Sequence, residues 1–144
     1  SRDYAVGDKA QLLKSYHASL AVALAWGGVC GAGFAWAAQT IQPGAWGIYE
    51  EVWGVVPLMW PLVAALGAHQ VAGAALIAVD RPGARACIDL ACLGLLAIGI
   101  GAGYHFGGTK GIALAAILAE LVAALLMVLV FYQRVRSTLV TARI

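Results

Sequence analysis

Four long runs of apolar residues are the feature of this sequence that most restricts its possible folds. A helix needs about 20 residues to cross roughly 30 Å of hydrocarbon, and runs of that order cover residues 18–40, 53–79, 86–106 and 111–133. Hydrophobic residues make up 62% of the chain and charged residues 11%, whereas a soluble domain carries about 25% charged residues. The sequence therefore predicts an all-α integral membrane protein with four transmembrane helices.

The segments outside these runs are too short to form a soluble domain. Residues 1–17 are a polar lead, in which Asp8 is placed to cap a short helix that lies at the membrane interface and continues into the first span. Residues 134–144 form a basic tail. We thus expect an interfacial lead (1–17), a four-helix bundle (18–133) and a cytoplasmic tail (134–144).

Lysine and arginine predict the orientation of the bundle, because cytoplasmic loops of membrane proteins collect these residues. With four spans, Lys110 alone falls on one side. The other side carries Arg2, Lys9, Lys14, Arg81, Arg85, Arg134, Arg136 and Arg143. Both termini are therefore predicted in the cytoplasm of a bacterium, with the basic residues at the lipid headgroups of the inner membrane and no nucleic-acid partner.

Small residues at four-residue spacing predict where the helices pack closely, since packing between lipid-embedded helices depends on small side chains. The residues in these patterns are Gly27, Gly31, Gly99, Gly103, Gly111, Ala115, Ala119 and Ala123. In the second span, Pro57 and Pro61 each lack an amide hydrogen and predict a kink in its outer half.

Two ionisable residues lie deep inside the predicted spans. His69 in the second span and Glu120 in the fourth fall within about one helical turn of each other in depth. An ionisable side chain at the bilayer centre costs about 2.5–3.5 kcal/mol, so both should face protein or water. The pair is either a structural hydrogen bond between helices or a proton-responsive or cation-linked site. Asp89 is interpreted as an acid in the first turn of the third span that complements the helix dipole.

The sequence contains no motif of an enzyme or of a cofactor site. Cys30, Cys87 and Cys92 fall inside spans without the paired spacing of a disulfide or a metal cluster. His17 and His105 lie at opposite interfaces, which argues against a pair of haem ligands. No nucleophile elbow, zinc-protease motif or phosphate loop is present. We expect no catalysis, no metal, no cofactor and no soluble small-molecule substrate.

The order of features resembles the last part of a known transporter family. The stretches are "GDKAQLLKSYHASLAVAL", "QPGAWGIYEEVWGVVPLMWPL", "GAHQVAGAALIAVDRPGARACIDL" and "FGGTKGIALAAILAELVAALLMVLV". They look like the last four helices of bacterial polysaccharide or lipid-linked oligosaccharide flippases, in the multidrug/oligosaccharidyl-lipid/polysaccharide exporter superfamily. The matching residues are Gly7, Asp8, Arg81, Pro82, Gly108, Gly111, Ala113, Ala115 and Glu120.

The resemblance implies a fold of two six-helix lobes around a cavity that holds the charged diphosphate of a lipid-linked sugar. This chain supplies only about four helices of the second lobe, and no basic residue lies inside a predicted span. Because alternating access needs two bodies around one site, the chain alone should not flip a lipid.

Three functional hypotheses remain, and they depend on whether Ser1 is a true N-terminus or a cut in a longer protein. The first is a truncated, flippase-like protein that is a non-catalytic accessory or structural subunit of a larger membrane complex of photosynthetic or respiratory type. Its partners would be membrane lipid and other integral membrane subunits. The second is the C-terminal fragment of a flippase. The third is a small oligomeric exporter, coupled to protons or cations through His69 and Glu120.

Overall fold

The structure is a computed structural model that describes residues 9–40 and 54–141. Within these ranges every regular element is helical: α2 (Lys9–Thr40), the short 3₁₀ helix η3 (Val56–Leu58), α4 (Met59–Ala78) and α5 (Pro82–Thr141). Asp8, expected to cap the interfacial helix, and Gly7, which shares the resemblance to the flippase family with Asp8, lie outside the described residues.

Three of the helical stretches are long and apolar enough to cross a membrane: Ala10–Ala37, Val56–Ala78 and Pro82–Ser137. This confirms the predicted class, a helical membrane protein. Residues 9–17 are helical and continue without a break into the rest of α2. The helix boundaries differ from the prediction at one place. The predicted third and fourth runs both lie in α5, which extends beyond them at both ends.

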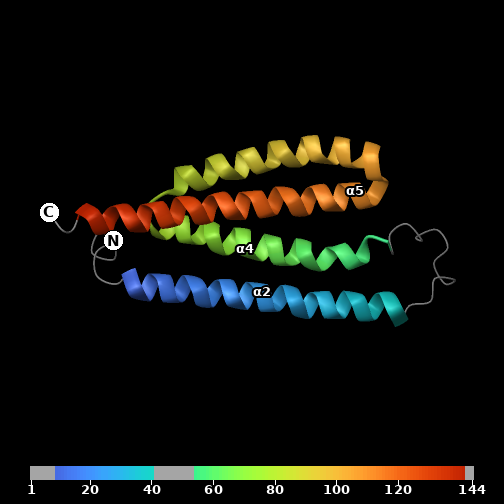
Figure 1. The fold of residues 1–144 in the computed structure, drawn as a ribbon, viewed down its shortest axis with the longest axis horizontal. Helices are drawn as coiled ribbons and strands as arrows, with labels where there is room; N and C mark the ends of the chain where they lie inside the picture. Colours follow the sequence, from blue (N-terminus) through green and yellow to red (C-terminus); the bar gives the residue numbers. More distant parts are fainter. Residues whose placement is uncertain (1–8, 41–53, 142–144) are drawn as a thin grey trace.

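The helix α5 folds back on itself at Gly108. This glycine has φ 58° and ψ −140°, a combination outside the helical region that joins two helical segments. We call residues 82–107 the first arm of α5 and residues 109–141 the second arm. Figure 1 shows the two arms running side by side in opposite directions, with the reversal at the end of the molecule far from the beginning of α2.

Glycines allow the two arms to touch along their backbones. A Cβ atom added to Gly103 would lie 2.5 Å from the carbonyl oxygen of Gly111, and one added to Gly99 would lie 3.0 Å from the Cβ of Ala115. Neither distance leaves room for a larger side chain, so the hairpin depends on small residues at these positions.

A tight turn joins α4 to α5. The amide of Arg81 donates to the carbonyl of Leu76 (2.9 Å), and the amide of Asp80 donates to that of Ile77 (3.0 Å). These two bonds form a Schellman motif, in which the residue after the helix takes the left-handed conformation. Asp80 has φ 60°, which an aspartate tolerates better than most residues. Pro82 then begins α5, where a missing amide hydrogen costs nothing.

The helix α4 is the centre of the arrangement. It packs against α2 on one side and against α5 on the other. The backbone of α2 approaches α4 closely at two glycines. A Cβ on Gly27 would lie 2.7 Å from the Cβ of Ala64, and one on Gly31 would lie 2.6 Å from that of Trp60. The first residues of α2 and the last of α5 lie at the same end of the molecule (Figure 1).

The main hydrophobic core lies where α2 begins and where α4 and the second arm of α5 end. Phe131, Leu76 and Met127 are its largest fully buried side chains. The whole cluster of buried residues is Tyr16, Ala72, Ala75, Leu76, Met127, Phe131 and Val135. Large apolar side chains elsewhere, such as Trp26, Trp36 and Phe106, are exposed, as is usual for a surface that meets lipid hydrocarbon.

The two prolines of the predicted second span lie at its beginning. Pro57 is in η3, and Pro61 is in the first turn of α4. At these positions the missing amide hydrogens would have no partner inside the helix in any case.

Candidate functional site: a buried histidine between two carboxylates

The imidazole of His69 is held between acidic side chains from both arms of α5. His69 lies in the middle of α4 and is only 7% exposed. Its Nδ1 is 2.5 Å from Oε2 of Glu120, on the second arm, and its Nε2 is 2.8 Å from Oδ1 of Asp89, on the first arm. The ring therefore links three helical segments through two hydrogen bonds.

The two hydrogen bonds of the His69 ring restrict the protonation states of the ring and of its two carboxyl partners. A neutral imidazole donates from only one nitrogen, and an ionised carboxylate only accepts. Each of the two N···O contacts of His69 needs one proton between its atoms. The ring is therefore a doubly protonated imidazolium, or one of the two carboxyl groups carries a proton. We call His69, Glu120, Asp89 and the two side chains that extend the network, Arg85 and Gln70, the polar cluster.

Arg85 and Gln70 continue the polar cluster from Asp89 along α4. The Arg85 Nε is 3.5 Å from Oδ2 of Asp89, and its Nη2 donates to Oε1 of Gln70 at 3.1 Å. Gly73 makes room for the guanidinium, since a Cβ there would lie 2.9 Å from the Arg85 Nε. With His69 as imidazolium, two positive and two negative groups balance, which suits a site surrounded by apolar helices.

A cysteine borders the polar cluster on the first arm of α5. Cys92 is 6% exposed, and its Sγ donates to the carbonyl oxygen of Ala119 at 3.6 Å. A nitrogen of His69, the Sγ of Cys92 and a carboxylate oxygen of Glu120 all lie within 4.8 Å of one another. Ala119 and Ala123 pack around the thiol. Small side chains from the second arm thus leave space for these three groups to meet.

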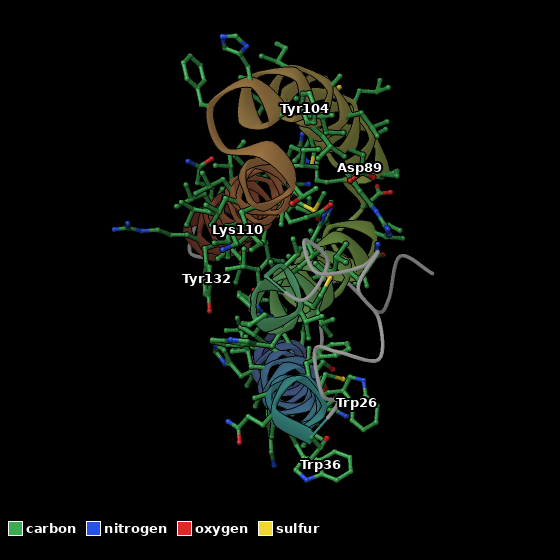
Figure 2. All side chains as sticks on the ribbon, turned by 90° about the vertical axis from the view of Figure 1, so that its right-hand side faces the viewer. Trp26, Trp36, Asp89, Tyr104, Lys110 and Tyr132 are labelled. Atoms are coloured by element: carbon green, nitrogen blue, oxygen red, sulfur yellow. The ribbon has the colours of Figure 1, made fainter. Side chains whose placement is uncertain are left out.

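The polar cluster lies inside the apolar length of the helices. His69 precedes the end of α4 by nine residues, and Asp89 follows the start of α5 by seven. At about 1.5 Å per residue, these positions lie roughly 10–14 Å from the turn between the two helices. Protein covers one end of the cluster better than the other, because the side chain of Glu120 is 15% exposed and that of Asp89 is 39% exposed. Figure 2 shows Asp89 on one flank of the bundle, opposite the flank of Tyr132.

The structure brings together the predicted pair, His69 and Glu120, and adds four further residues to the site: Gln70, Arg85, Asp89 and Cys92. Asp89 is not in the first turn of its helix, because α5 begins at Pro82 and not at residue 86. For the same reason, Arg85, which precedes the predicted third span, lies in the apolar stretch Pro82–Ser137. Cys92 is also a member of the site. The sequence does contain a pattern that places three of these residues together. Spacings of four and three residues put Arg85, Asp89 and Cys92 on one face of a helix.

The other two histidines do not join the polar cluster. His17 contacts the Tyr132 hydroxyl with its Nε2 at 2.7 Å, near the beginning of α2. His105 packs edge-on against Phe106 close to the Gly108 reversal, and its side chain is exposed. Of the small residues predicted for helix packing, Gly27 and Gly31 lie at the contact between α2 and α4. The others lie between the arms of α5: Gly99, Gly103, Gly111 and Ala115 in the contacts described above, and Ala119 and Ala123 beside Cys92.

Comparison with protein-family models, with curated proteins and with solved structures found no match for this chain. Its function is therefore inferred from its residues and their geometry.

Proposed function

We propose that the chain crosses the inner membrane of a bacterium four times, with both termini in the cytoplasm. The four crossings would be α2, η3 with α4, and the two arms of α5. A straight helix of 60 residues would be about 90 Å long, three times the hydrocarbon thickness, so the reversal at Gly108 supports two crossings by α5. The concentration of Lys and Arg on the side opposite Lys110 supports the orientation.

In that membrane, the chain is a non-catalytic accessory or structural subunit of a larger membrane complex, of the photosynthetic or respiratory type. The observation that carries this proposal is the exposed end of the polar cluster. The Asp89 side chain is 39% exposed and the Arg85 side chain 26% exposed, in a stretch of α5 that is long and apolar enough to cross a membrane. Lipid hydrocarbon cannot hydrogen-bond to these groups, whereas a neighbouring protein surface can.

A second feature agrees with a neighbour on this flank. Within the described residues, the carboxyl group of Glu120 and the imidazole of His69 are largely covered by the chain's own helices, while the Asp89 end is not. Ionisable side chains in membrane helices almost always face the protein interior or a water-filled cavity. A partner helix against the Asp89 flank would place the whole polar cluster in such an interior.

The proposal is tested by native mass spectrometry of the particle that contains this chain, isolated from its own membrane in mild detergent. We expect a multi-subunit complex with the chain in fixed stoichiometry. We also expect Asp89→Asn to weaken the association under the same conditions. Asp80→Asn is the matched control, because Asp80 is exposed in the turn outside α4 and α5. A particle that consists of the chain alone would contradict the proposal.

A second candidate is the C-terminal part of a polysaccharide or lipid-linked oligosaccharide flippase. It is favoured by the positions of the residues that carry the resemblance. Gly108 forms the reversal of α5, Gly111 lies against Gly103 of the other arm, and Glu120 reaches His69. Three of the motif residues thus have structural roles in one hairpin. Under this candidate, the reading frame upstream of Ser1 encodes about eight more hydrophobic spans, and a frame without them would eliminate it.

A further inference from the structure

We propose that His69, Cys92 and Glu120 form a binding site for one divalent metal ion of borderline softness, with Zn²⁺ as the best fit. The site joins α4 to both arms of α5. It goes beyond the accessory role proposed above and holds whether the chain is a subunit of a complex or part of a transporter. It also differs from the sequence-based expectation, which found no metal motif because the three residues are far apart in the sequence.

The distances between the three ligand atoms are close to those of a zinc site. Zinc binds imidazole nitrogen and carboxylate oxygen at about 2.0–2.2 Å and thiolate sulfur at about 2.3 Å, which puts tetrahedral ligand atoms roughly 3.3–3.8 Å apart. In the structure, a nitrogen of His69, the Sγ of Cys92 and a carboxylate oxygen of Glu120 lie within 4.8 Å of one another. Separately, Nδ1 of His69 is 2.5 Å from Oε2 of Glu120. Side-chain movements of about 1 Å would admit the ion.

Asp89 is placed to accept the hydrogen bond that usually orients a histidine ligand of a metal ion. A histidine ligand usually donates its second N–H to a carboxylate, which fixes the tautomer and the orientation of the ring. Asp89 is 2.8 Å from Nε2 of His69, on the side of the ring away from Glu120. With the proton on Nε2, the lone pair of Nδ1 points toward Glu120 and is free to bind the ion. Arg85 in turn pairs with Asp89. This arrangement is independent of the three ligand distances and points to the same site.

The charge of the filled site suits its surroundings. Zinc with one thiolate, one carboxylate and a neutral imidazole has a formal charge of zero, which limits the cost of placing the ion at membrane depth. On binding, the ion replaces the thiol proton of Cys92 and the proton between His69 and Glu120. Both protons leave to the solvent, and no oxidant or reductant is involved.

The ligand set selects the class of metal. A thiolate and an imidazole favour zinc and its neighbours over Mg²⁺ or Ca²⁺, which prefer oxygen ligands. Three protein ligands leave a fourth tetrahedral position for water or another small ligand. By linking three helical segments, the bound ion should also stabilise the bundle.

The test uses the full chain without a histidine tag, in detergent or nanodiscs, after chelation and desalting. Zn²⁺ is added, the excess is removed, and bound metal is measured by elemental mass spectrometry. We expect one Zn²⁺ per chain and a thermal unfolding temperature that rises with free Zn²⁺, because the ion binds the folded state. With Co²⁺ as a probe, we expect the charge-transfer absorption of a cobalt–thiolate bond. No stoichiometric metal, or bound Co²⁺ without this absorption, would overturn the site.

Matched variants assign the ligands. Cys92→Ser and Glu120→Gln should each remove stoichiometric binding, whereas Cys87→Ser, at an exposed cysteine five residues away, should bind as the unmodified chain does. Asp89→Asn leaves all three ligands in place and should weaken binding about 10–100-fold. Circular dichroism verifies that each variant is folded. Equal binding by Cys92→Ser and Cys87→Ser would refute the proposal, and the cobalt spectrum of the unmodified chain decides the question if Cys92→Ser does not fold.

Discussion

At the scale of single residues, the contact between His69 and Glu120 should be energetically coupled. His69→Gln and Glu120→Gln each leave a largely buried partner without its hydrogen bond, which should lower the free energy of unfolding by about 1–3 kcal/mol. In the double variant neither charged partner remains. We therefore expect its free energy of unfolding to fall by about 0.5–2 kcal/mol less than the sum of the two single decreases. Reversible unfolding in mixed micelles measures all three values.

The control for this cycle is His105→Gln. His105 is exposed and belongs to no hydrogen bond of the polar cluster, so its substitution should change the free energy of unfolding by less than about 0.5 kcal/mol. Strict additivity of His69→Gln and Glu120→Gln would show that the two side chains do not interact in the membrane.

The sequence located part of this site for a physical reason. Ionisable residues are rare inside apolar runs, which identifies His69 and Glu120 as candidates. Their similar depth in the membrane follows from counting residues from the ends of the runs. Asp89 and Cys92 could not be assigned in the same way. Their roles depend on where α5 begins and on how the helices are rotated about their axes. Every face of these spans is apolar enough to meet either lipid or protein, and the rotation is therefore not encoded in a hydrophobic pattern.

At the scale of elements, the contact between the arms of α5 should not tolerate an added methyl group. Gly103→Ala would place a Cβ 2.5 Å from the Gly111 carbonyl oxygen and force the arms apart, at a cost of about 1–3 kcal/mol. Gly101→Ala is the matched control in the same arm. No atom lies within 4 Å of its added Cβ, so alanine there should be neutral or stabilise the helix by up to about 1 kcal/mol. Equal effects at the two positions would contradict the observed hairpin.

The reversal of α5 should depend on the conformational freedom of Gly108. At φ 58° and ψ −140°, a side chain is strained even though no atom lies within 4 Å of an added Cβ. Gly108→Ala should therefore cost about 1–3 kcal/mol, through backbone strain alone. Gly107→Ala, at the preceding glycine with equally open surroundings, should have little effect. Unfolding measurements on the two variants separate strain from crowding, and a harmless Gly108→Ala would argue against this backbone conformation.

At the scale of the whole molecule, the sequence predicted the class of fold more firmly than its arrangement. Apolar length and low charge alone require membrane-spanning helices, and three such stretches are present in the described residues. The position of α4 between α2 and the two arms of α5 could not be predicted. Glycine and alanine patterns indicate which face of a helix packs closely, but they do not indicate which other helix it packs against. The contacts that place α4 there involve Ala64, Trp60 and His69, which no small-residue pattern contains.

The arrangement of the helices makes a prediction about membrane sidedness. The beginning of α2 and the end of α5 lie at one end of the bundle, and the Gly108 reversal lies at the other (Figure 1). Single cysteines replacing Ser15 and Ser137 should therefore react with a membrane-impermeant maleimide from the same side, and one replacing Thr109 should react only from the opposite side. In inverted vesicles, the first two should be labelled if both termini are cytoplasmic.

The labelling is carried out in a chain in which Cys30 and Cys87 are replaced by serine. The remaining native thiol, Cys92, is 6% exposed and should stay unlabelled, which makes the parent chain an internal control. Labelling at positions 15 and 137 from opposite sides would require an odd number of crossings. That result would contradict the four proposed crossings: either α5 crosses the membrane once, without the hairpin and its contact between Gly103 and Gly111, or one of α2 and α4 does not cross.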